Sequence, residues 1–474
     1  MKYKKRITAF IVATQIAFGA TLGGMSSITA SASAYWPSNV GLSGAGESAV
    51  VMDVNTGTVL YEQNGDVKHY PASITKILTA LVALENTNLN DEVVFSSDAV
   101  YKNEGDSSHI ARDLGEKMTM EECLYGMMLE SANECAYAIA EFTAAKNGGG
   151  EYQDFIKMMN DKAKELGCKN THFNNANGLP DEEHYTTAYD MALISRAAYR
   201  NDTFAKITGT KSYKIPPTNK HSESTLLNNH HAMLNYYQTS KHLYDYCVGG
   251  KTGYTTVANS TLVTYAKKDD MTLVCVIMNA NSPDHYLDTR SLMDYCFDNF
   301  TVYNVSEYAN IFSEQAKSNA GIFGENIDLI KVDEEGQVIL PKTVDFSEAE
   351  ATIVPDEEEN DESVGRIEYT YGGKYVGGAD LLYTESSVAA SYPFHNIDAE
   401  DGGSKVDYIR IDFTLFLWIA LIVGAIAGVA AFIHAKSGRI LLYKSRKIDS
   451  KRRKKTKYKQ IRRKRARRLS KKRR

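Results

Sequence analysis

The segment Phe413–Ile433 constrains the chain most, because its 21 residues include no charged side chain. An apolar run of this length is long enough to cross a hydrocarbon core of about 30 Å as a helix. The residues that follow, Lys436–Arg474, hold 22 of the chain's 54 Lys and Arg and a single acid, Asp449. Because positive charge is retained on the cytoplasmic side of a membrane, we expect this tail inside the cell and the preceding residues outside.

The N-terminus predicts export across the same membrane. Basic residues are concentrated in Met1–Arg6, and an apolar stretch runs from Ile7 to Leu22. Small residues of the kind found at signal-peptide cleavage sites follow at Ala30–Ala34. This is the layout of a secretory signal peptide, with an uncleaved anchor helix as the alternative. The region between the two membrane signals carries nearly all of the 59 acidic residues, which fits two compartments with different partners.

The length of 474 residues allows two or three domains. After about residue 302, short strand-like runs alternate with acidic and Gly-rich turns, as in a small β domain. We therefore expect a signal peptide at 1–34, a main domain at 35–301, a small β-rich domain at 302–392, a linker at 393–412, a transmembrane helix at 413–433 and a basic tail at 434–474. The tail's charge fits anionic lipid head groups, whereas a nucleic-acid partner has no motif in its favour. The oligomeric state is left open by the sequence.

Apolar periodicity predicts the elements of the main domain. A hairpin is expected at Ala49–Asn55 and Val59–Gln63, and Ser73 precedes a helical run, at a terminus where free backbone N–H groups gather. Further helices are expected at 119–129, opened by a capping box, and at 133–144, 187–199 and 289–300, with strands at 261–266 and 272–278.

Three short motifs follow one another in this domain. Ser73–Lys76 reads Ser-x-x-Lys, Ser131–Asn133 reads Ser-x-Asn, and Lys251–Gly253 reads Lys-Thr-Gly. Each is weak alone, but Ser-x-x-Lys occurs once in the chain, and the order and element contexts of all three are typical of a serine acyl-enzyme.

The chemistry of these residue types supports catalytic roles. Residues three apart share a helix face, so Lys76 can reach the Ser73 hydroxyl, which needs an adjacent base to become a nucleophile. A lysine close to apolar surface and to a second cation, here Lys251, loses proton affinity and can serve as that base. We expect Ser131 to relay a proton between Lys76 and the leaving amine.

Other residues of the motifs are suited to binding. We expect Asn133 to hold a substrate amide, and Lys251 and Thr252 to bind a terminal carboxylate. Gly253 would let the strand backbone approach the ligand closely.

These residues resemble the low-molecular-weight penicillin-binding proteins, specifically the serine D-alanyl-D-alanine carboxypeptidases. The resemblance covers roughly residues 45–300, and beyond the three motifs it includes Tyr70–Ser73, Asn177–Asp181, Tyr189–Ala192 and Lys251–Thr255. It implies an α+β fold of the β-lactamase/transpeptidase type, with an antiparallel sheet flanked by helices and a helical lobe. A small all-β domain and a single transmembrane helix would follow.

The resemblance also implies the reaction and its partners. The substrate would be the peptidoglycan stem peptide ending in D-Ala-D-Ala, and β-lactams would be covalent inhibitors. The backbone N–H groups of Ser73 and Tyr254 would form the oxyanion hole, and no cofactor is expected. The chain departs from the family at Glu134, where Asp or Gly is usual, and in having a spanning segment in place of an amphipathic C-terminal helix.

Two alternatives remain. A class A β-lactamase shares the three motifs but needs a Glu that activates the deacylating water, and no Glu-x-x-Leu-Asn follows residue 140. The expected β domain also argues against that class. A non-catalytic wall-binding scaffold would leave the site vestigial, which the complete set of motif residues argues against.

Cysteine and histidine patterns do not indicate a metal site. The six cysteines show no zinc-type spacing, and we expect buried free thiols in preference to disulfides. No H-E-x-x-H pattern occurs, so we expect the histidines to lie on the surface or to support neighbouring residues, with no bound metal. The cysteines are Cys123, Cys135, Cys168, Cys247, Cys275 and Cys296, and the histidines considered are His69, His109, His184, His221, His230 and His231.

Overall fold

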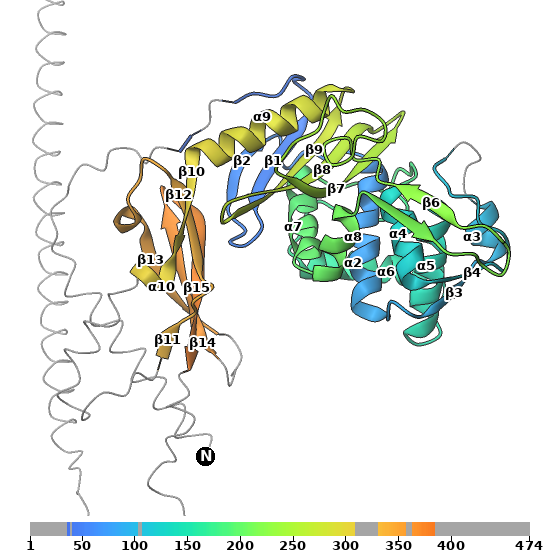
Figure 1. Ribbon diagram of the computed structural model, residues 1–474. Coiled ribbons are helices and arrows are strands. Elements are labelled where there is room, and N and C mark those ends of the chain that lie inside the picture. The colour runs from blue at the N-terminus through green and yellow to red at the C-terminus, as the bar shows by residue number, and fades with distance from the viewer. Residues whose placement is uncertain (1–35, 38–39, 103–106, 309–329, 357–362, 384–474) are drawn as a thin grey trace, which may run out of the picture. The chain divides into compact units, whose positions relative to one another are not determined.

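The computed structural model describes residues 36–37, 40–102, 107–308, 330–356 and 363–383 (Figure 1). The expected signal peptide, linker, transmembrane helix and basic tail all lie outside these residues. Within the described ranges, no helix is long and apolar enough to cross a membrane.

A five-stranded antiparallel sheet is the centre of the main domain. Its order is β2-β1-β9-β8-β7. The strands are β1 (Ser48–Asp53), β2 (Val59–Gln63), β7 (Cys247–Thr255), β8 (Asn259–Lys268) and β9 (Met271–Ala280). The predicted β1–β2 hairpin and the two strands expected at 261–266 and 272–278 are confirmed, with β8 and β9 a few residues longer than expected.

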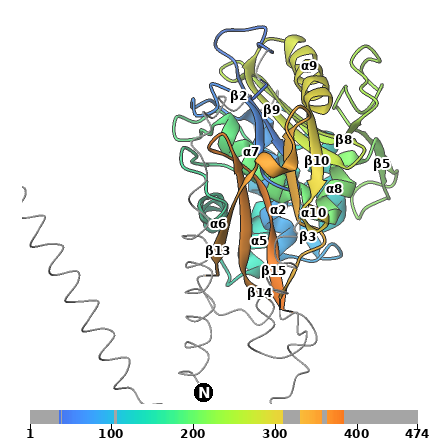
Figure 2. The same cartoon turned by 90° about the vertical axis from the view of Figure 1, so that its left-hand side faces the viewer.

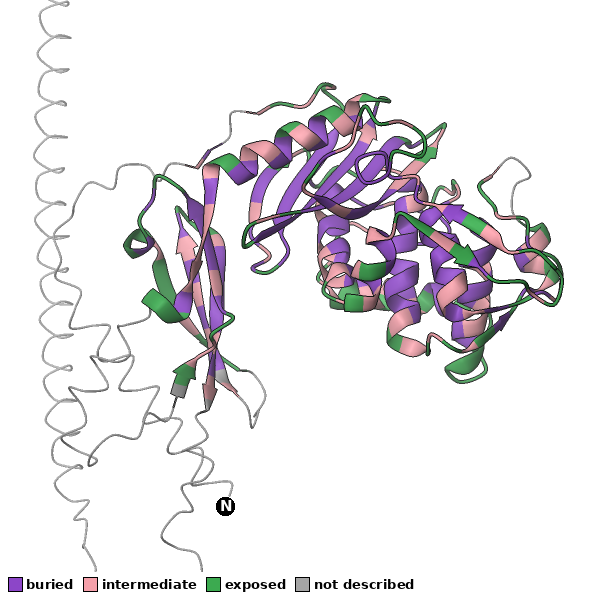
Figure 3. Ribbon diagram, viewed as in Figure 1, coloured by how far each residue is buried: buried purple, intermediate pink, exposed green. Residues whose placement is uncertain are grey.

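Both faces of this sheet are covered, as the strand sequences require. In β9, Val274, Val276 and Met278 pack into one hydrophobic cluster, while Leu273, Cys275 and Ile277 pack into another. Alternate residues of a strand point to opposite faces, so a strand that is apolar at every position needs cover on both sides. Figure 3 shows these central strands buried along most of their length.

Helices provide that cover. On one face lie α2 (Lys76–Asn86), α4 (Met120–Leu129), α5 (Asn133–Lys146), α6 (Tyr152–Glu165), α7 (Ala188–Tyr199) and α8 (Asp202–Gly209). On the other face lies α9 (Asp284–Asn299), whose Leu292 and Met293 join the second cluster. The smaller elements are η1 (Ala72–Thr75), α3 (Ser97–Tyr101), β3 (Glu92–Val94), β4 (Lys117–Thr119), β5 (Ser212–Ile215) and β6 (Thr225–Asn228). The result is a mixed α+β fold with antiparallel sheets and helices, as expected.

A local signal read from the sequence positions the helix that leads to Ser131. The capping box is present: the Thr119 hydroxyl accepts from the Glu122 N–H, and the Glu122 carboxylate accepts from the Thr119 N–H. These bonds satisfy donors that the first turn of α4 would otherwise leave unpaired.

A second antiparallel sheet follows α9, with the order β10-β12-β15-β14-β13 and β11 paired to β15 (Figure 2). The strands are β10 (Phe300–Asn304), β11 (Ile330–Val332), β12 (Gln337–Pro341), β13 (Glu350–Pro355), β14 (Ser363–Tyr371) and β15 (Lys374–Tyr383), with two short helical turns, α10 (Val305–Tyr308) and η2 (Phe346–Glu348). The sheet has its own apolar cluster but belongs to the same compact unit as the first sheet. A separate small all-β domain therefore stays a prediction.

Candidate active site

Ser73 and Lys76 come from a tight turn that leads into α2. Ser73 lies in the 3₁₀ turn η1, and Lys76 is the first residue of α2. This turn brings Lys76 Nζ to 3.0 Å from Ser73 Oγ, as the three-residue spacing predicts. Ala72, just before the serine, has φ +51°, a left-handed conformation that non-glycine residues adopt at a cost. The nucleophile is therefore held on a strained backbone.

The Lys76 amine is enclosed by hydrogen-bond acceptors. Its side chain is fully buried, and Nζ donates to Asn133 Oδ1 at 2.7 Å and to the Asn177 carbonyl at 2.6 Å. A neutral amine has two N–H bonds and one lone pair. When the two N–H bonds go to these acceptors, the lone pair is left for the Ser73 hydroxyl, which is the arrangement a general base needs.

Burial and charge lower the proton affinity of this amine. Desolvation, and then the charge of Lys251, lower the pKa of Lys76 well below its usual value, while Glu134 and Cys135 act in the opposite direction. Burial also lowers the pKa of Lys251 to about 7, against the raising effect of Glu130. A lysine with such a depressed pKa can be neutral near pH 7, as a base must be.

Two glycines allow other backbone segments to contact the nucleophile turn. A Cβ added to Gly253 would lie 2.9 Å from the Ser73 nitrogen. A Cβ added to Gly178, whose φ is +90°, would lie 1.9 Å from the Ala72 carbonyl oxygen. A Cβ at Gly253 would also lie 2.4 Å from Thr261 Oγ1 of β8. The expected role of Gly253 in letting a ligand approach the strand stays a prediction.

Ser131 and Asn133 flank the break between α4 and α5. Ser131 has φ +62° and is 6% exposed, and its Oγ has no hydrogen-bond partner among the described residues. Its role as a proton relay stays a prediction. Asn133 contacts Lys76 through Oδ1, so the amide NH₂ is the end of its side chain that can donate to a substrate carbonyl, in keeping with the role expected for it.

The Lys-Thr-Gly segment lies in β7, the edge strand next to η1. Lys251 is buried, with Nζ 3.0 Å from the Thr252 carbonyl oxygen, whereas the Tyr254 side chain is 69% exposed. The short distance from Gly253 to the Ser73 nitrogen places the Tyr254 backbone one residue along the same strand. An oxyanion hole made by Ser73 and Tyr254 N–H groups agrees with this arrangement and stays a prediction.

Three further residues support the site, and the sequence predicts a specific contact for none of them. Asn177 accepts from Lys76 through its carbonyl, and Thr261 Oγ1 donates to the Pro71 carbonyl at 2.8 Å, holding the turn against β8. His184 Nδ1 accepts from the backbone N–H of Asn174, so its Nε2 donates to Thr75 Oγ1 at 2.9 Å. Burial lowers the pKa of His184 to about 3, which keeps this ring neutral. Asn177 belongs to a segment already noted for its resemblance, but nothing in its spacing indicated a contact with the base.

The cysteines and histidines take structural positions. All six cysteines are free, and all except the partly exposed Cys168 are buried, as expected. His231 is buried behind β7, with Nε2 3.1 Å from the Val263 carbonyl oxygen. In the part of the chain that the structure describes, no group of three His, Cys, Asp or Glu could hold a metal ion.

A buried lysine in contact with a serine, with a second buried lysine on the neighbouring edge strand, is the arrangement expected of a serine enzyme that works through an acyl-enzyme with lysine as its base. Comparison with known proteins agrees. The family described as D-alanyl-D-alanine carboxypeptidase (peptidase S11) matches residues 37–282, and the chain belongs to this family.

Individual relatives share the same part of the chain. D-alanyl-D-alanine carboxypeptidase DacF of Bacillus subtilis is 34% identical over 261 residues, which is 54% of this chain and 62% of that protein. DacB2 of Mycobacterium tuberculosis is 32% identical over 54% of this chain and 83% of its own length. The solved Streptomyces K15 DD-transpeptidase is 30% identical, covers 55% of this chain and 100% of its own, and superposes with a TM-score of 0.49.

Proposed function

We propose that this serine D-Ala-D-Ala carboxypeptidase removes the terminal D-alanine from peptidoglycan stem peptides through an acyl-enzyme on Ser73. The observation that carries the proposal is the 3.0 Å contact between Lys76 Nζ and Ser73 Oγ, made by a fully buried amine. Family membership supplies the substrate class.

Acylation begins when Lys76 takes the Ser73 proton as Oγ attacks the penultimate carbonyl. The carbonyl oxygen becomes an oxyanion, which the N–H groups of Ser73 and Tyr254 stabilise. By analogy with a measured oxyanion-hole donor, one such hydrogen bond contributes about 10²–10³ in rate. The proton then passes through Ser131 to the departing amine, the C–N bond breaks, and D-alanine leaves.

Deacylation reverses these roles with water as the nucleophile. Water attacks the ester carbon and gives a proton to the site's base, and Ser73 Oγ leaves with a proton as the shortened peptide departs. A β-lactam would acylate Ser73 in the same way, but its ring-opened leaving group stays tethered, so covalent inhibition is expected.

Substrate recognition falls to the β7 strand. We assign Lys251 and Thr252 to the free carboxylate of the terminal D-alanine and Asn133 to a backbone carbonyl of the peptide. A cationic ammonium beside a hydroxyl is a suitable receptor for a carboxylate. The low polarity around the buried Lys251 strengthens that attraction.

We also propose where the enzyme acts. The signal sequence, the apolar 413–433 segment and the basic tail would place the catalytic residues outside the membrane, anchored by one helix, with the tail on anionic lipid inside. This agrees with a substrate that is part of the cell wall.

The direct test is release of D-alanine from a stem pentapeptide by purified residues 35–410. Wild-type protein should release one D-alanine per peptide, and Ser73→Ala should release none while retaining its circular dichroism spectrum. Equal release by both proteins would show that another residue is the nucleophile.

A further inference from the structure

Glu134 is the first residue after the Ser-x-Asn motif and lies in the first turn of α5. Its side chain is 3% exposed, and Oε1 accepts the Ile110 N–H at 2.6 Å. Its other oxygen, Oε2, is buried and has no hydrogen-bond partner within the described ranges. An ionised carboxylate so deeply buried is costly unless hydrogen bonds or a nearby opposite charge offset the loss of water.

The loop before α4 is tied to the catalytic end of α5 at two points. The Asn133 N–H donates to the Ser108 carbonyl at 2.9 Å, and the Ile110 N–H donates to Glu134. Asn133 in turn accepts from Lys76 through Oδ1. The position of the catalytic lysine therefore depends on how firmly this loop is held against α5.

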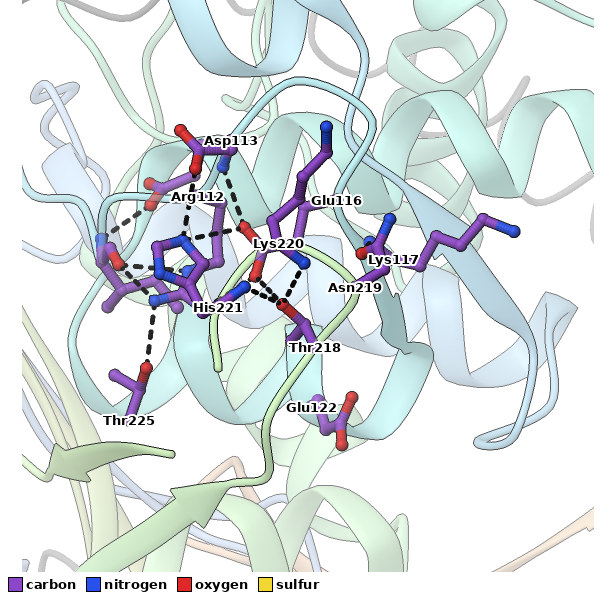
Figure 4. Close-up of polar contacts among 12 residues, drawn as sticks. Arg112, Asp113, Glu116, Lys117, Glu122, Thr218, Asn219, Lys220, His221 and Thr225 are labelled. Carbon is purple, nitrogen blue, oxygen red and sulfur yellow. Dashed lines mark hydrogen bonds and ion pairs between the residues drawn. The ribbon is translucent and has the colours of Figure 1, made fainter. Parts of the chain in front are cut away.

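An internal ion pair holds the other side of the loop (Figure 4). Arg112 Nε and Nη2 donate to the Ile110 carbonyl at 3.1 and 2.8 Å, and Arg112 Nη1 pairs with Glu116 Oε1 at 2.9 Å. Both charged side chains are almost completely buried, at 3% and 0% exposed. Thr218 Oγ1 donates to the same Glu116 oxygen at 2.8 Å. The Ile110 backbone is thus held through its carbonyl as well as through its N–H.

Several charges act on this part of the site. Lys251 of β7 disfavours the protonated form of Lys76, whereas Glu134 favours it. Burial raises the pKa of Glu134 above its usual value, although the Ile110 N–H, the N–H of Glu134 itself, His109 and Arg112 act in the opposite direction. The titratable neighbours of this pair are Lys251, Cys135, Cys123, His184, His109, Arg112 and Glu116.

We propose that Glu134 is a positioning residue for acylation: its carboxylate holds the 108–112 loop against α5, and with it the Asn133 side chain that Lys76 contacts. The negative charge of the same carboxylate also favours the protonated form of Lys76. The inference rests on the proposed function, because it assigns Lys76 as the base. Burial and Lys251 alone would make Lys76 a weak base, and the Glu134 charge offsets part of that effect. The usual Asp or Gly of the family at this position would have a shorter reach or none.

The effect of the Glu134 charge on Lys76 has a direction that can be measured. Removing the Glu134 charge lowers the pKa of Lys76, so the neutral amine persists to lower pH. The acid limb of the acylation profile, which is the range of pH over which the rate rises as Lys76 loses its proton, therefore moves to lower pH. A single nearby charge typically shifts a pKa by roughly one unit or more. The glutamine variant keeps an oxygen for the Ile110 N–H, so it tests the charge separately from the hydrogen bond.

The experiment measures the rate at which a penicillin acylates the purified ectodomain, residues 35–410, from pH 4.5 to 9. Four proteins are compared. These are wild type, Glu134→Gln, Glu134→Asp and Glu141→Gln. Glu141 is a matched control, since it lies on α5, is partly buried and accepts a hydrogen bond from Ser96 at 2.7 Å, yet it is not among the groups that act on Lys76.

We expect the acid limb of Glu134→Gln to lie about one pH unit below that of wild type, and that of Glu141→Gln to coincide with wild type. Glu134→Asp keeps the charge, but the aspartate side chain is too short for the Ile110 contact. Its acid limb should therefore lie at the wild-type pH, while its maximal acylation rate falls several-fold. If the acid limb of Glu134→Gln coincided with that of wild type, the proposed effect of the Glu134 charge on Lys76 would be wrong. A wild-type plateau in Glu134→Asp would overturn positioning, and this variant decides alone if Glu134→Gln does not fold. Lack of any Ser73 adduct in the wild type would instead defeat the proposed function.

Discussion

Lys251 allows a quantitative prediction about substrate choice. Burial lowers its pKa to about 7, so the cationic form that binds a carboxylate is present below pH 7 and is lost above it. The protonated fraction of such a group falls about tenfold between pH 6 and pH 8. A substrate with a free terminal carboxylate should lose that advantage over the same interval, whereas its terminal amide has no advantage to lose.

The assay compares kcat/KM for a stem peptide ending in free D-Ala-D-Ala with kcat/KM for its terminal amide. Because kcat/KM reports ionisations of the free enzyme, the requirement for neutral Lys76 affects both substrates and cancels in their ratio. The ratio should fall about tenfold from pH 6 to pH 8 in the wild type, and in Lys251→Ala it should be small and independent of pH.

Two results would refute this reasoning. A wild-type ratio near one at every pH would show that no receptor for the carboxylate exists, and an endopeptidase would then describe the enzyme better. A large ratio that persists in Lys251→Ala would assign the receptor to another group. Glu130→Gln adds a check, since loss of the charge that raises the Lys251 pKa should move the fall in the ratio to lower pH.

Three further predictions follow from the site and the topology. Lys76→Ala should slow penicillin acylation by about 10²–10⁴-fold, the usual contribution of a general base, with an unchanged circular dichroism spectrum; a rate near wild type would exclude Lys76 as the base. Gly178→Ala should lower stability by about 1–3 kcal/mol more than Gly167→Ala, because the two glycines have similar φ angles of +90° and +87° but a Cβ would meet another atom within 4 Å only at Gly178; equal melting temperatures would contradict the close packing. Protease added outside intact spheroplasts should remove residues 35–410 and spare the basic tail, and a protected ectodomain would contradict the proposed topology.

Local patterns were sufficient to predict much of the fold. The helix Met120–Leu129 and the β1–β2 hairpin depend on a capping box and on a turn, which are short-range signals. The distance from Ser73 to Lys76 follows from their spacing alone. The main differences are in the helix boundaries: the last helix of the main domain begins at Asp284, five residues before the expected start, and the turn at Ser73 is 3₁₀.

Other parts of the site depend on contacts between distant segments. The Asn177 carbonyl reaches Lys76 across 101 positions of sequence, and Thr261 reaches Pro71 across 190. No local pattern encodes such pairings, and none indicated the left-handed conformation of Ser131 between α4 and α5. The sequence marks Glu134 only as a departure from the family, because a buried carboxylate cannot be recognised before burial is known.

The intact mass of the ectodomain after penicillin treatment, followed by peptide mapping, tests the central claim most directly. We expect one adduct per chain, located on the peptide that contains Ser73 and absent from Ser73→Ala. An adduct on another serine, or undiminished labelling of Ser73→Ala, would contradict the assignment of the nucleophile and with it the proposed mechanism.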